Sequence, residues 1–485
     1  MKCYLLVGAL ASFGCASTSP KPAFDDTARM VQERSGQAIA WSEDDDRAAI
    51  DRTVAGLLGT PLTPQAAVQV ALLRNRHLQA TFEDLGVAQA ELVQAGLLKN
   101  PTLFGSIHFP LSTGAVADGT LIGAFDFIDA FSVPAKKHIA ASRLAATKAR
   151  VADSVLDLAH ETAAAYYAAI SASQILAMRR AVLEAGEAAT EIARRLAAAG
   201  NTSELDLANR EMELEALTLE ALRAEAMAAG TREALTRRMG LFGMATTYAL
   251  PEKLPELPKD DALPDHLESL AITQRLDLTA AHEDAQSISH ELAMFRNFRL
   301  WGLIGPVEGA YEKTFAGSEV AGPGTTLELP IFDQKQAVGA RLEARLRQSL
   351  DREEALAVDI RSEVREVRAR VGFARKLVES YQTRIVPLRE HVVQLTEERY
   401  NAMLAGVFQL VIAKQLEVEA YASLIDGLRD YWTSRSDLER AVGGRLGEQP
   451  TTNTSNAGTT APKQQMPDMP DMPGMNMHDM KNMQH

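Results

Sequence analysis

The stretch ALLRNRHLQATFED, residues Ala71–Asp84, has a second version two hundred positions further on, AITQRLDLTAAHED, residues Ala271–Asp284. The two versions share their first residue, their closing Glu-Asp pair, and a leucine and an alanine in between. A second pair repeats less strictly: LAAAGNTSELDLANREMELEA at 196–216 corresponds to MLAGVFQLVIAKQLEVEA at 403–420. Self-similarity at a long fixed interval indicates one supersecondary unit used twice. Two copies of that unit make up most of the chain.

Each copy has the same predicted order: a helix, an extended region rich in Gly and aromatic residues, and a very long helix that turns back on itself. In the first copy, residues 136–199 contain no Pro and only Gly186 as a glycine, which predicts a helix of about 60 residues, roughly 90 Å long. The second copy has a heptad seam typical of a coiled coil, and Pro387 inside it is expected to bend the helix. The seam consists of Val364, Val371, Val378, Ile385 and Val392 at one core position and Val367, Ala374, Tyr381, Leu388 and Leu395 at the other.

Each long helix is predicted to reverse at a hairpin tip. Gly200 is followed by Asn-Thr-Ser-Glu at 201–204, which combines a glycine helix stop with a hydroxyl cap for the next helix. Gly406, followed by Val407 and Phe408, marks the matching turn in the second copy.

Segments of alternating apolar and polar residues lie between the short and the long helices. TLFGSIHF at 102–109 and LIGAFDF at 121–127 predict a β-hairpin, and Leu300–Tyr311 and Thr325–Leu329 supply two strands in the second copy. Strands with one apolar and one polar face are typical of membrane β-barrels, the smallest of which have eight strands. Four strands per chain are too few, so several chains must share one barrel.

Composition excludes several classes of function. The net charge of −14 is spread along 485 residues and no basic patch with interleaved aromatic residues is present, which argues against nucleic acid as a partner. After the N-terminal segment no run reaches the roughly 18 apolar residues of a transmembrane helix. Ten scattered histidines, with no zinc-protease, phosphate-loop or nucleophile-elbow motif, predict a protein that is not an enzyme. The Glu-Asp pairs at 83–84 and 283–284 are interpreted as solvated helix faces.

The N-terminus has the pattern of a secretory signal peptide: Lys2, an apolar stretch at 4–13, and Gly14 before Cys15. Both cysteines of the chain, Cys3 and Cys15, fall in this segment, so the rest of the chain has no disulfide framework. Cys15 after Ser-Phe-Gly resembles a bacterial lipobox, and lipidation of Cys15 is expected; an ordinary signal peptide with an incidental thiol is the alternative. Ala16 resembles an outer-membrane sorting signal.

Three further features accompany the doubled unit: NPTL at Asn100–Leu103, LPIFDQKQ at Leu329–Gln336, and a glycine at each hairpin tip. Together, over about residues 61–444, these features resemble the TolC family of outer-membrane efflux channels. The resemblance implies a mainly α fold with a small β part. In such a homotrimer, long coiled-coil helical hairpins form an α-barrel, and four strands per protomer contribute to a shared twelve-stranded outer-membrane β-barrel. It also implies a periplasmic adaptor, an inner-membrane resistance-nodulation-division pump and outer-membrane lipid as partners, with no required cofactor.

The expected organisation follows from these features. Residues 1–15 are a signal peptide and 16–60 an N-terminal segment; 61–240 are the first repeat, with strands at about 102–129. Residues 241–264 form a Pro-rich equatorial linker, and 265–444 the second repeat, with strands at about 300–329. Residues 445–485 are a disordered tail with a Met-rich part at 466–483.

The resemblance implies that the hairpin tips meet the adaptor; the alternative is that their residues only terminate and pack helices. Many family members narrow the tunnel with carboxylates near the second tip, but residues 407–415 contain no acid. Glu204 and Asp206 at the first tip either replace that ring or favour a helix N-terminus through its dipole. The docking candidates are Arg194, Arg195, Leu196, Gly200, Ser203, Arg399, Tyr400, Leu404, Gly406 and Leu410.

The C-terminal tail is rich in methionine, with seven in the eighteen residues 466–483 and no Leu, Ile, Val or Phe. Soft thioethers on a polar tether suit soft monovalent ions, so the tail is expected to bind Cu(I) or Ag(I). A low-complexity tail without function is the alternative. The expected ligands are Met466, Met469, Met472, Met475, Met477, His478, Met480 and Met483.

The predicted function is therefore the exit channel of a tripartite pump that exports heavy-metal ions, Cu(I) or Ag(I), from the periplasm or cytoplasm to the exterior. One alternative keeps the channel and changes the cargo to drugs or organic solutes. Another class of protein is a periplasmic copper-binding coiled-coil lipoprotein that spans no membrane, against which the alternating strands argue.

Overall fold

The structure, a computed structural model, describes residues 17–41, 47–109, 111, 117–259, 263–314 and 316–446. The expected signal peptide with Cys15, and the methionine tail from Met466 to Met483, lie outside the described residues. The chain up to Leu446 forms one compact unit, and all helices and strands named here belong to it.

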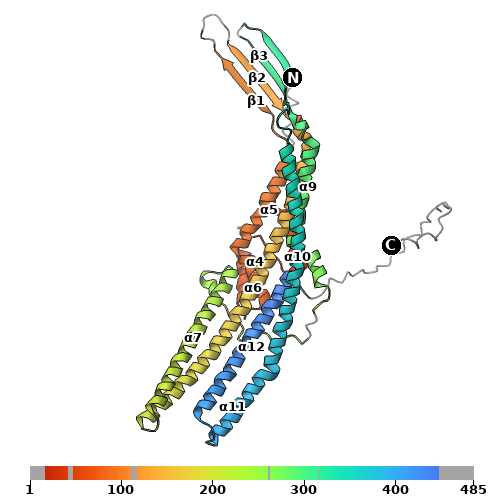
Figure 1. The fold of residues 1–485 in the computed structure, drawn as a ribbon. Helices are drawn as coiled ribbons and strands as arrows, with labels where there is room; N and C mark the ends of the chain where they lie inside the picture. The colour runs from red at the N-terminus through yellow and green to blue at the C-terminus, as the bar shows by residue number, and fades with distance from the viewer. Residues whose placement is uncertain are drawn as a thin grey trace, which may run out of the picture. The chain divides into compact units, whose positions relative to one another are not determined.

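Helices dominate the described chain, and four strands accompany them, as predicted (Figure 1). The first half contains α2 (Lys21–Ser35), α3 (Arg47–Leu58), α4 (Pro64–Arg74), α5 (Arg76–Ala95), β1 (Thr102–His108), β2 (Asp118–Phe125), α6 (Phe127–Ala198) and α7 (Glu204–Arg238). The second half contains α8 (Leu267–Gln274), α9 (Leu276–Phe298), β3 (Ile304–Lys313), β4 (Glu319–Leu327), α10 (Gln336–Ser380), α11 (Val386–Asn401) and α12 (Val407–Val442). Within this unit, the strands lie at one end and the α6–α7 and α11–α12 hairpins turn at the other.

Helix α6 is longer than predicted, with 72 residues and a length of about 108 Å at the standard rise. It begins at Phe127 because the side chain of Asp126 accepts a hydrogen bond from the backbone N–H of Asp129, at 3.0 Å, and so caps the first turn. Pro134 lies inside the helix, where it leaves one carbonyl without a helical partner. The helix starts nine residues before Lys136, the first residue of the predicted helix.

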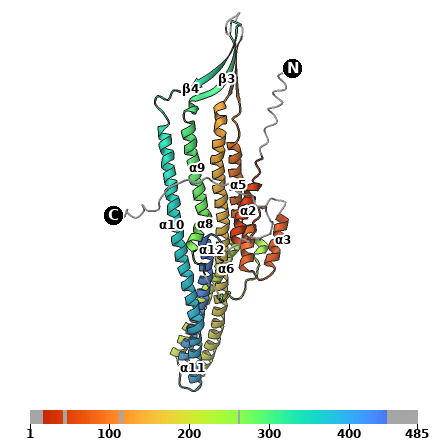
Figure 2. The same ribbon diagram turned by 90° about the vertical axis from the view of Figure 1, so that its right-hand side faces the viewer.

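The four strands form one antiparallel sheet in chain order, β1-β2-β3-β4; Figure 1 labels β1 to β3, and Figure 2 labels β3 and β4. The predicted hairpin of β1 and β2 is present, with Leu103 opposite Gly123 and Gly105 opposite Leu121. The later strands are shifted from their predicted bounds. A short 3₁₀ turn at Trp301–Leu303 delays the start of β3, and β4 begins at Glu319, six residues earlier than predicted.

The predicted heptad seam is buried over only half of its length. Val364, Val367, Val371, Ala374 and Val378 are buried. Beyond them the helix passes through a π-helical turn at Tyr381–Ile385, directly before Pro387. A wider turn is a common response to a missing backbone donor. In the second half of the seam Leu388, Val392 and Leu395 are 62%, 39% and 45% exposed, so the described part of this chain does not cover them by itself.

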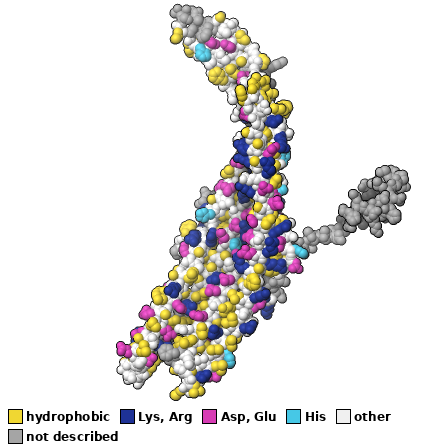
Figure 3. All heavy atoms as spheres, viewed as in Figure 1, with side chains coloured by type: hydrophobic (Ala, Val, Ile, Leu, Met, Phe, Trp, Pro, Cys, Tyr) yellow, Lys and Arg dark blue, Asp and Glu magenta, His cyan; other side chains and the backbone are white. Residues whose placement is uncertain are grey.

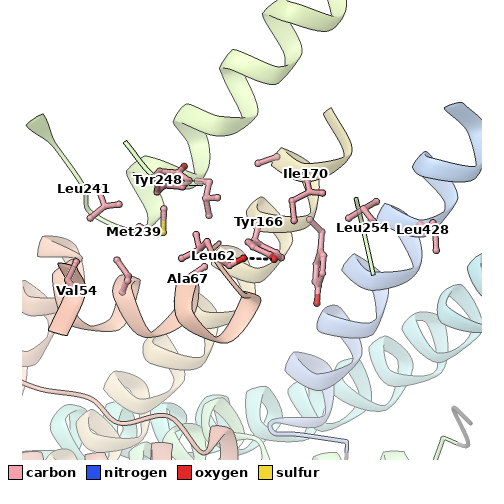
Figure 4. Packing of buried hydrophobic residues seen from close by; sticks show 14 of the residues in the cluster. Val54, Leu62, Ala67, Tyr166, Ile170, Met239, Leu241, Tyr248, Leu254 and Leu428 are labelled. Atoms are coloured by element: carbon pink, nitrogen blue, oxygen red, sulfur yellow. Dashed lines mark hydrogen bonds between the residues drawn. The ribbon is translucent and has the colours of Figure 1, made fainter. Parts of the chain in front are cut away.

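The core that joins the two halves lies where α4, α6, α7 and α12 meet (Figure 4). Tyr166 is fully buried there, and its hydroxyl donates a hydrogen bond to the backbone carbonyl of Leu62 at 2.8 Å. Burial raises the pKa of Tyr166 to about 12. Leu428 from α12 belongs to the same apolar cluster as Leu62 and Met239 from the first half. The two halves therefore share one core at this level.

Two glycines in the left-handed conformation end the return helices of the hairpins. Gly240 follows α7 with a φ of +66°, and a Cβ added to it would lie 2.7 Å from the carbonyl oxygen of Arg74, at the α4–α5 junction. Gly443 follows α12 with a φ of +84°, and a Cβ there would lie 3.0 Å from the backbone nitrogen of Arg275, at the α8–α9 junction. Only glycine permits both the backbone conformation and the close approach.

Candidate functional site

The first hairpin tip connects α6 to α7 through residues 199–203. Gly200 has a φ of +75°, and its N–H donates to the carbonyl of Ala197 while that of Asn201 donates to the carbonyl of Leu196, both at 2.9 Å. This pair of bonds is a Schellman motif. Ser203 then caps α7 by accepting a hydrogen bond from the backbone N–H of Asp206 at 3.1 Å. The glycine stop and the hydroxyl cap are both as predicted.

The second tip uses the same motif with a different residue. The N–H groups of Met403 and Leu404 donate to the carbonyls of Tyr400 and Arg399, at 2.9 and 2.8 Å. Met403, not a glycine, holds the left-handed position, with a φ of +60°. Gly406 has an extended backbone and precedes α12 as its N-cap, so its position corresponds to that of Ser203 rather than Gly200. The sequence carried no glycine signal for Met403, and the prediction missed it.

Most of the ten docking candidates are exposed, but two arginines already have partners. Arg194 pairs with Glu211 across the first hairpin, and Arg195 pairs with Glu191 on its own helix, both at 2.9 Å. Leu404 is 70% exposed at the second tip. The remaining candidates are Leu196, Gly200, Ser203, Arg399, Tyr400 and Gly406, all exposed, and Leu410, which is partly buried.

One acid of the first tip, Asp206, contacts the residue that caps α7. The carboxylate of Asp206 accepts a hydrogen bond from the Ser203 hydroxyl at 2.6 Å, which completes the cap of α7. Sequence reasoning did not find the polar contact that links the two hairpins, in which Gln415 of α12 donates to Glu213 of α7 at 3.0 Å. Glu213 also pairs with the buried Arg210 at 2.8 Å. Such contacts join distant segments, and local patterns do not reveal them.

The sheet has two chemically different faces, because residues directly opposite each other in the register share a face. Acidic and histidine side chains gather with apolar ones at the strand end in Figure 3. No Lys or Arg belongs to the more polar face within the described strands. The apolar face carries Leu103, Ile107, Leu121, Phe125, Val307 and Tyr311, with the ion pair of Lys313 and Glu319 at its end; the opposite face carries Ser106, His108, Asp118, Thr120, Glu308 and Glu312, together with Phe104, Ile122 and Ala310.

Ion pairs among α6, α9, α10 and α12 join the two halves. Arg275 at the start of α9 is buried and pairs with Asp277 at 2.6 Å and with Glu363 of α10 at 2.8 Å. Burial opposes ionisation of Asp277, but the hydrogen bonds and charge of Arg275 outweigh it and lower the Asp277 pKa. The carboxylate of Asp153 on α6 lies 3.3 Å from the guanidinium of Arg440 on α12. Burial raises the pKa of Asp153 to about 6, although the charge of Arg440 lowers it.

The described part of the chain holds no group of three or more His, Cys, Asp or Glu side chains placed to bind a metal ion. None of its helices is long and apolar enough to cross a membrane.

No protein-family profile and no curated protein match the sequence. Among solved structures, the chain is similar to a membrane protein from Pseudomonas aeruginosa, with a TM-score of 0.67 and 21% identity over 78% of this chain and 92% of that one. It is similar to CusC, whose structures concern folding and transmembrane channel formation, with a TM-score of 0.63 and 17% identity over 79% and 92%. It is also similar to the open state of the MtrE outer membrane channel of Neisseria gonorrhoeae, with a TM-score of 0.64 and 19% identity over 79% and 89%. The chain thus has the fold of outer-membrane channels.

Proposed function

We propose that this chain is the outer-membrane exit channel of a tripartite efflux pump of the TolC family, passive in itself and powered by its partners. The observation that carries the proposal is the fold shared with outer-membrane channels over most of each chain. The two faces of the sheet support it, since an apolar face suits lipid on one side and a polar face suits water on the other.

The channel is a homotrimer in this proposal. β1 and β4 are the edge strands of the sheet, and each presents backbone donors and acceptors on its outer side. Pairing β1 of one copy with β4 of the next closes a shared barrel of twelve strands. On α7, Leu205, Met212 and Leu219 recur at heptad spacing and are 70%, 68% and 53% exposed. They supply a helix face that a neighbouring helix can cover.

The proposal includes an internal duplication of residues 61–240 and 265–444, joined by the linker at 241–264. The two Schellman tips and the two closing glycines support it. At the α4–α5 junction the side chain of Asn75 donates to the carbonyl of Arg238 at 2.9 Å. At the α8–α9 junction the side chain of Arg275 donates to the carbonyl of Ala441 at 3.3 Å. Two unrelated halves would not be expected to join the corresponding helix junction to the end of the corresponding return helix by a side-chain hydrogen bond.

The hairpin tips are the proposed docking site for a periplasmic adaptor, through which an inner-membrane resistance-nodulation-division pump delivers the cargo. Met403 and Leu404 are 94% and 70% exposed at the second tip, and Leu196 is 44% exposed at the first. Exposed apolar side chains of this kind are typical anchors for a protein partner.

The proposed cargo is heavy-metal ions, Cu(I) or Ag(I). Its support is the methionine-rich tail, whose thioethers prefer soft ions. Lipidation of Cys15 would add an anchor in the outer membrane. Export of drugs or organic solutes through the same channel is the competing cargo.

Metal tolerance in a strain without this protein tests the cargo. The strain is complemented with the full chain or with a chain that stops before Gln464, at equal expression, and cell-associated copper and silver are measured. We expect the full chain to restore tolerance and to lower cell-associated metal. Equal rescue by both chains would mean that the tail is dispensable. No rescue by either, with restored tolerance to organic toxicants, would replace the metal cargo with an organic one.

A further inference from the structure

Helices α6 and α9 lie side by side between the shared core and the sheet (Figure 2), and polar contacts join them at intervals. Arg150 of α6 pairs with Asp284 of α9. Further toward the sheet, Arg143 donates to the hydroxyl of Ser287 at 3.2 Å and lies 3.4 Å from the carboxylate of Glu291. The residue numbers fall on α6 as they rise on α9, so the helices run antiparallel. At each of these contacts an arginine of α6 donates to an oxygen atom of an α9 side chain.

The next contact toward the sheet departs from this pattern, because it brings two basic side chains together. The imidazole rings of His138 on α6 and His290 on α9 have their centroids 5.9 Å apart. Both residues are exposed. Within the described residues, no hydrogen bond engages the ring nitrogens of either one, whereas His160 bonds to Ser436 and His282 to Glu353.

The ring spacing fits two ligands of one metal ion. A metal–imidazole bond of about 2.0–2.1 Å places the ion about 3.2 Å from each ring centroid. Two such rings are then about 4.5 Å apart at the right angle of a tetragonal Cu(II) site and about 6.4 Å apart in a trans arrangement. The observed 5.9 Å lies between these limits.

We propose that His138 and His290 form a two-histidine binding site for a transition-metal cation, with Cu(II) as the ion bound most tightly. Imidazole suits the later first-row metals, and Cu(II) has the highest affinity among the divalent ions for such ligands. Water completes the coordination shell, in keeping with the absence of a third His, Cys, Asp or Glu ligand among the described residues. The site needs only one chain, so it stands independently of the proposed export function.

Copper titration of the untagged full chain in detergent tests the site. The proteins compared are the natural chain, His138→Ala, His290→Ala, and the control His391→Ala, which removes an exposed imidazole on α11. Alanine is the best helix former, so these exposed substitutions leave the fold intact, and far-ultraviolet circular dichroism checks this. All four proteins keep the tail, so copper bound by the tail contributes equally.

We expect the natural chain and His391→Ala to bind about one Cu(II) more per chain than either His138→Ala or His290→Ala. The electron paramagnetic resonance spectrum of that additional copper should carry nitrogen hyperfine splitting from two imidazoles. A fifth protein, in which both His138 and His290 are replaced by alanine, should lose no more copper than each single variant. Equal copper binding by all four proteins would overturn the proposal, and so would a loss confined to one of the two histidines.

Discussion

At the glycine that follows α12, a single added methyl group should disturb the fold strongly. A Cβ at Gly443 would lie 3.0 Å from the backbone nitrogen of Arg275 and 3.0 Å from the backbone carbonyl carbon of Gln274. The left-handed conformation alone costs an alanine about 1 kcal/mol. Backbone atoms at a helix junction cannot rotate away as a side chain can. We therefore expect Gly443→Ala to lower the free energy of unfolding by about 3 kcal/mol or more.

Gly200→Ala is the matched control for this substitution. Gly200 also has a positive φ, +75°, but no atom lies within 4 Å of an added Cβ. Its cost should be limited to the conformational term of about 1 kcal/mol. Thermal unfolding of both full-length variants in detergent, followed by circular dichroism, should give a decrease in Tm at least twice as large for Gly443→Ala. Equal decreases would refute the close approach of α12 to the α8–α9 junction.

Three further substitutions test separate parts of the molecule. Replacing Glu308 and Glu312 by Gln should lower the cation-to-anion permeability ratio of the reconstituted channel roughly twofold or more. The ratio is obtained from reversal potentials in a salt gradient. The control substitution Glu319→Gln, on the opposite face of the sheet, should leave the ratio unchanged. Met403→Gly should raise the free energy of unfolding by about 1 kcal/mol because Met403 has a φ of +60°. Met403→Ala should leave the free energy of unfolding unchanged. An equal gain from both substitutions would contradict the idea that the Met403 backbone is strained. The pKa of Asp153 is raised to about 6, so the folded chain binds the carboxyl proton more tightly than the unfolded chain does. The stability that protonated Asp153 contributes is therefore present at low pH and is lost as the pH rises through about 6. Asp153→Asn should therefore reduce the fall in Tm between about pH 3.5 and 7.5, a range that brackets both the unfolded and the folded pKa of Asp153. An unchanged fall would rule out this group as its source.

The features that sequence patterns located are those set by neighbouring residues. Alternation placed β1 within a residue of its observed end, and Gly200 with Ser203 placed the first tip, because a strand face and a helix cap are local properties. The start of α6 was missed because Pro134 suggested a boundary, while the cap at Asp126 lies upstream of it.

Other features depend on contacts between distant segments and could not be predicted. The first half of the predicted heptad seam is buried, but periodicity does not reveal which helix covers a seam, and Leu388 and Leu395 are exposed within the chain. Met403 adopts a left-handed backbone that favours glycine, because closure of the hairpin overrides its local preference. The contact between Gln415 and Glu213 joins two hairpins and has no local signal.

Conductance measurements test whether this chain forms a membrane channel. The purified full chain, monodisperse in detergent, is added to a planar lipid bilayer under a salt gradient. We expect stepwise conductance increases of uniform size from an assembly whose mass corresponds to three chains. A correctly folded protein that remains a single chain and produces no conductance would overturn the proposed channel function and would favour a periplasmic copper-binding lipoprotein.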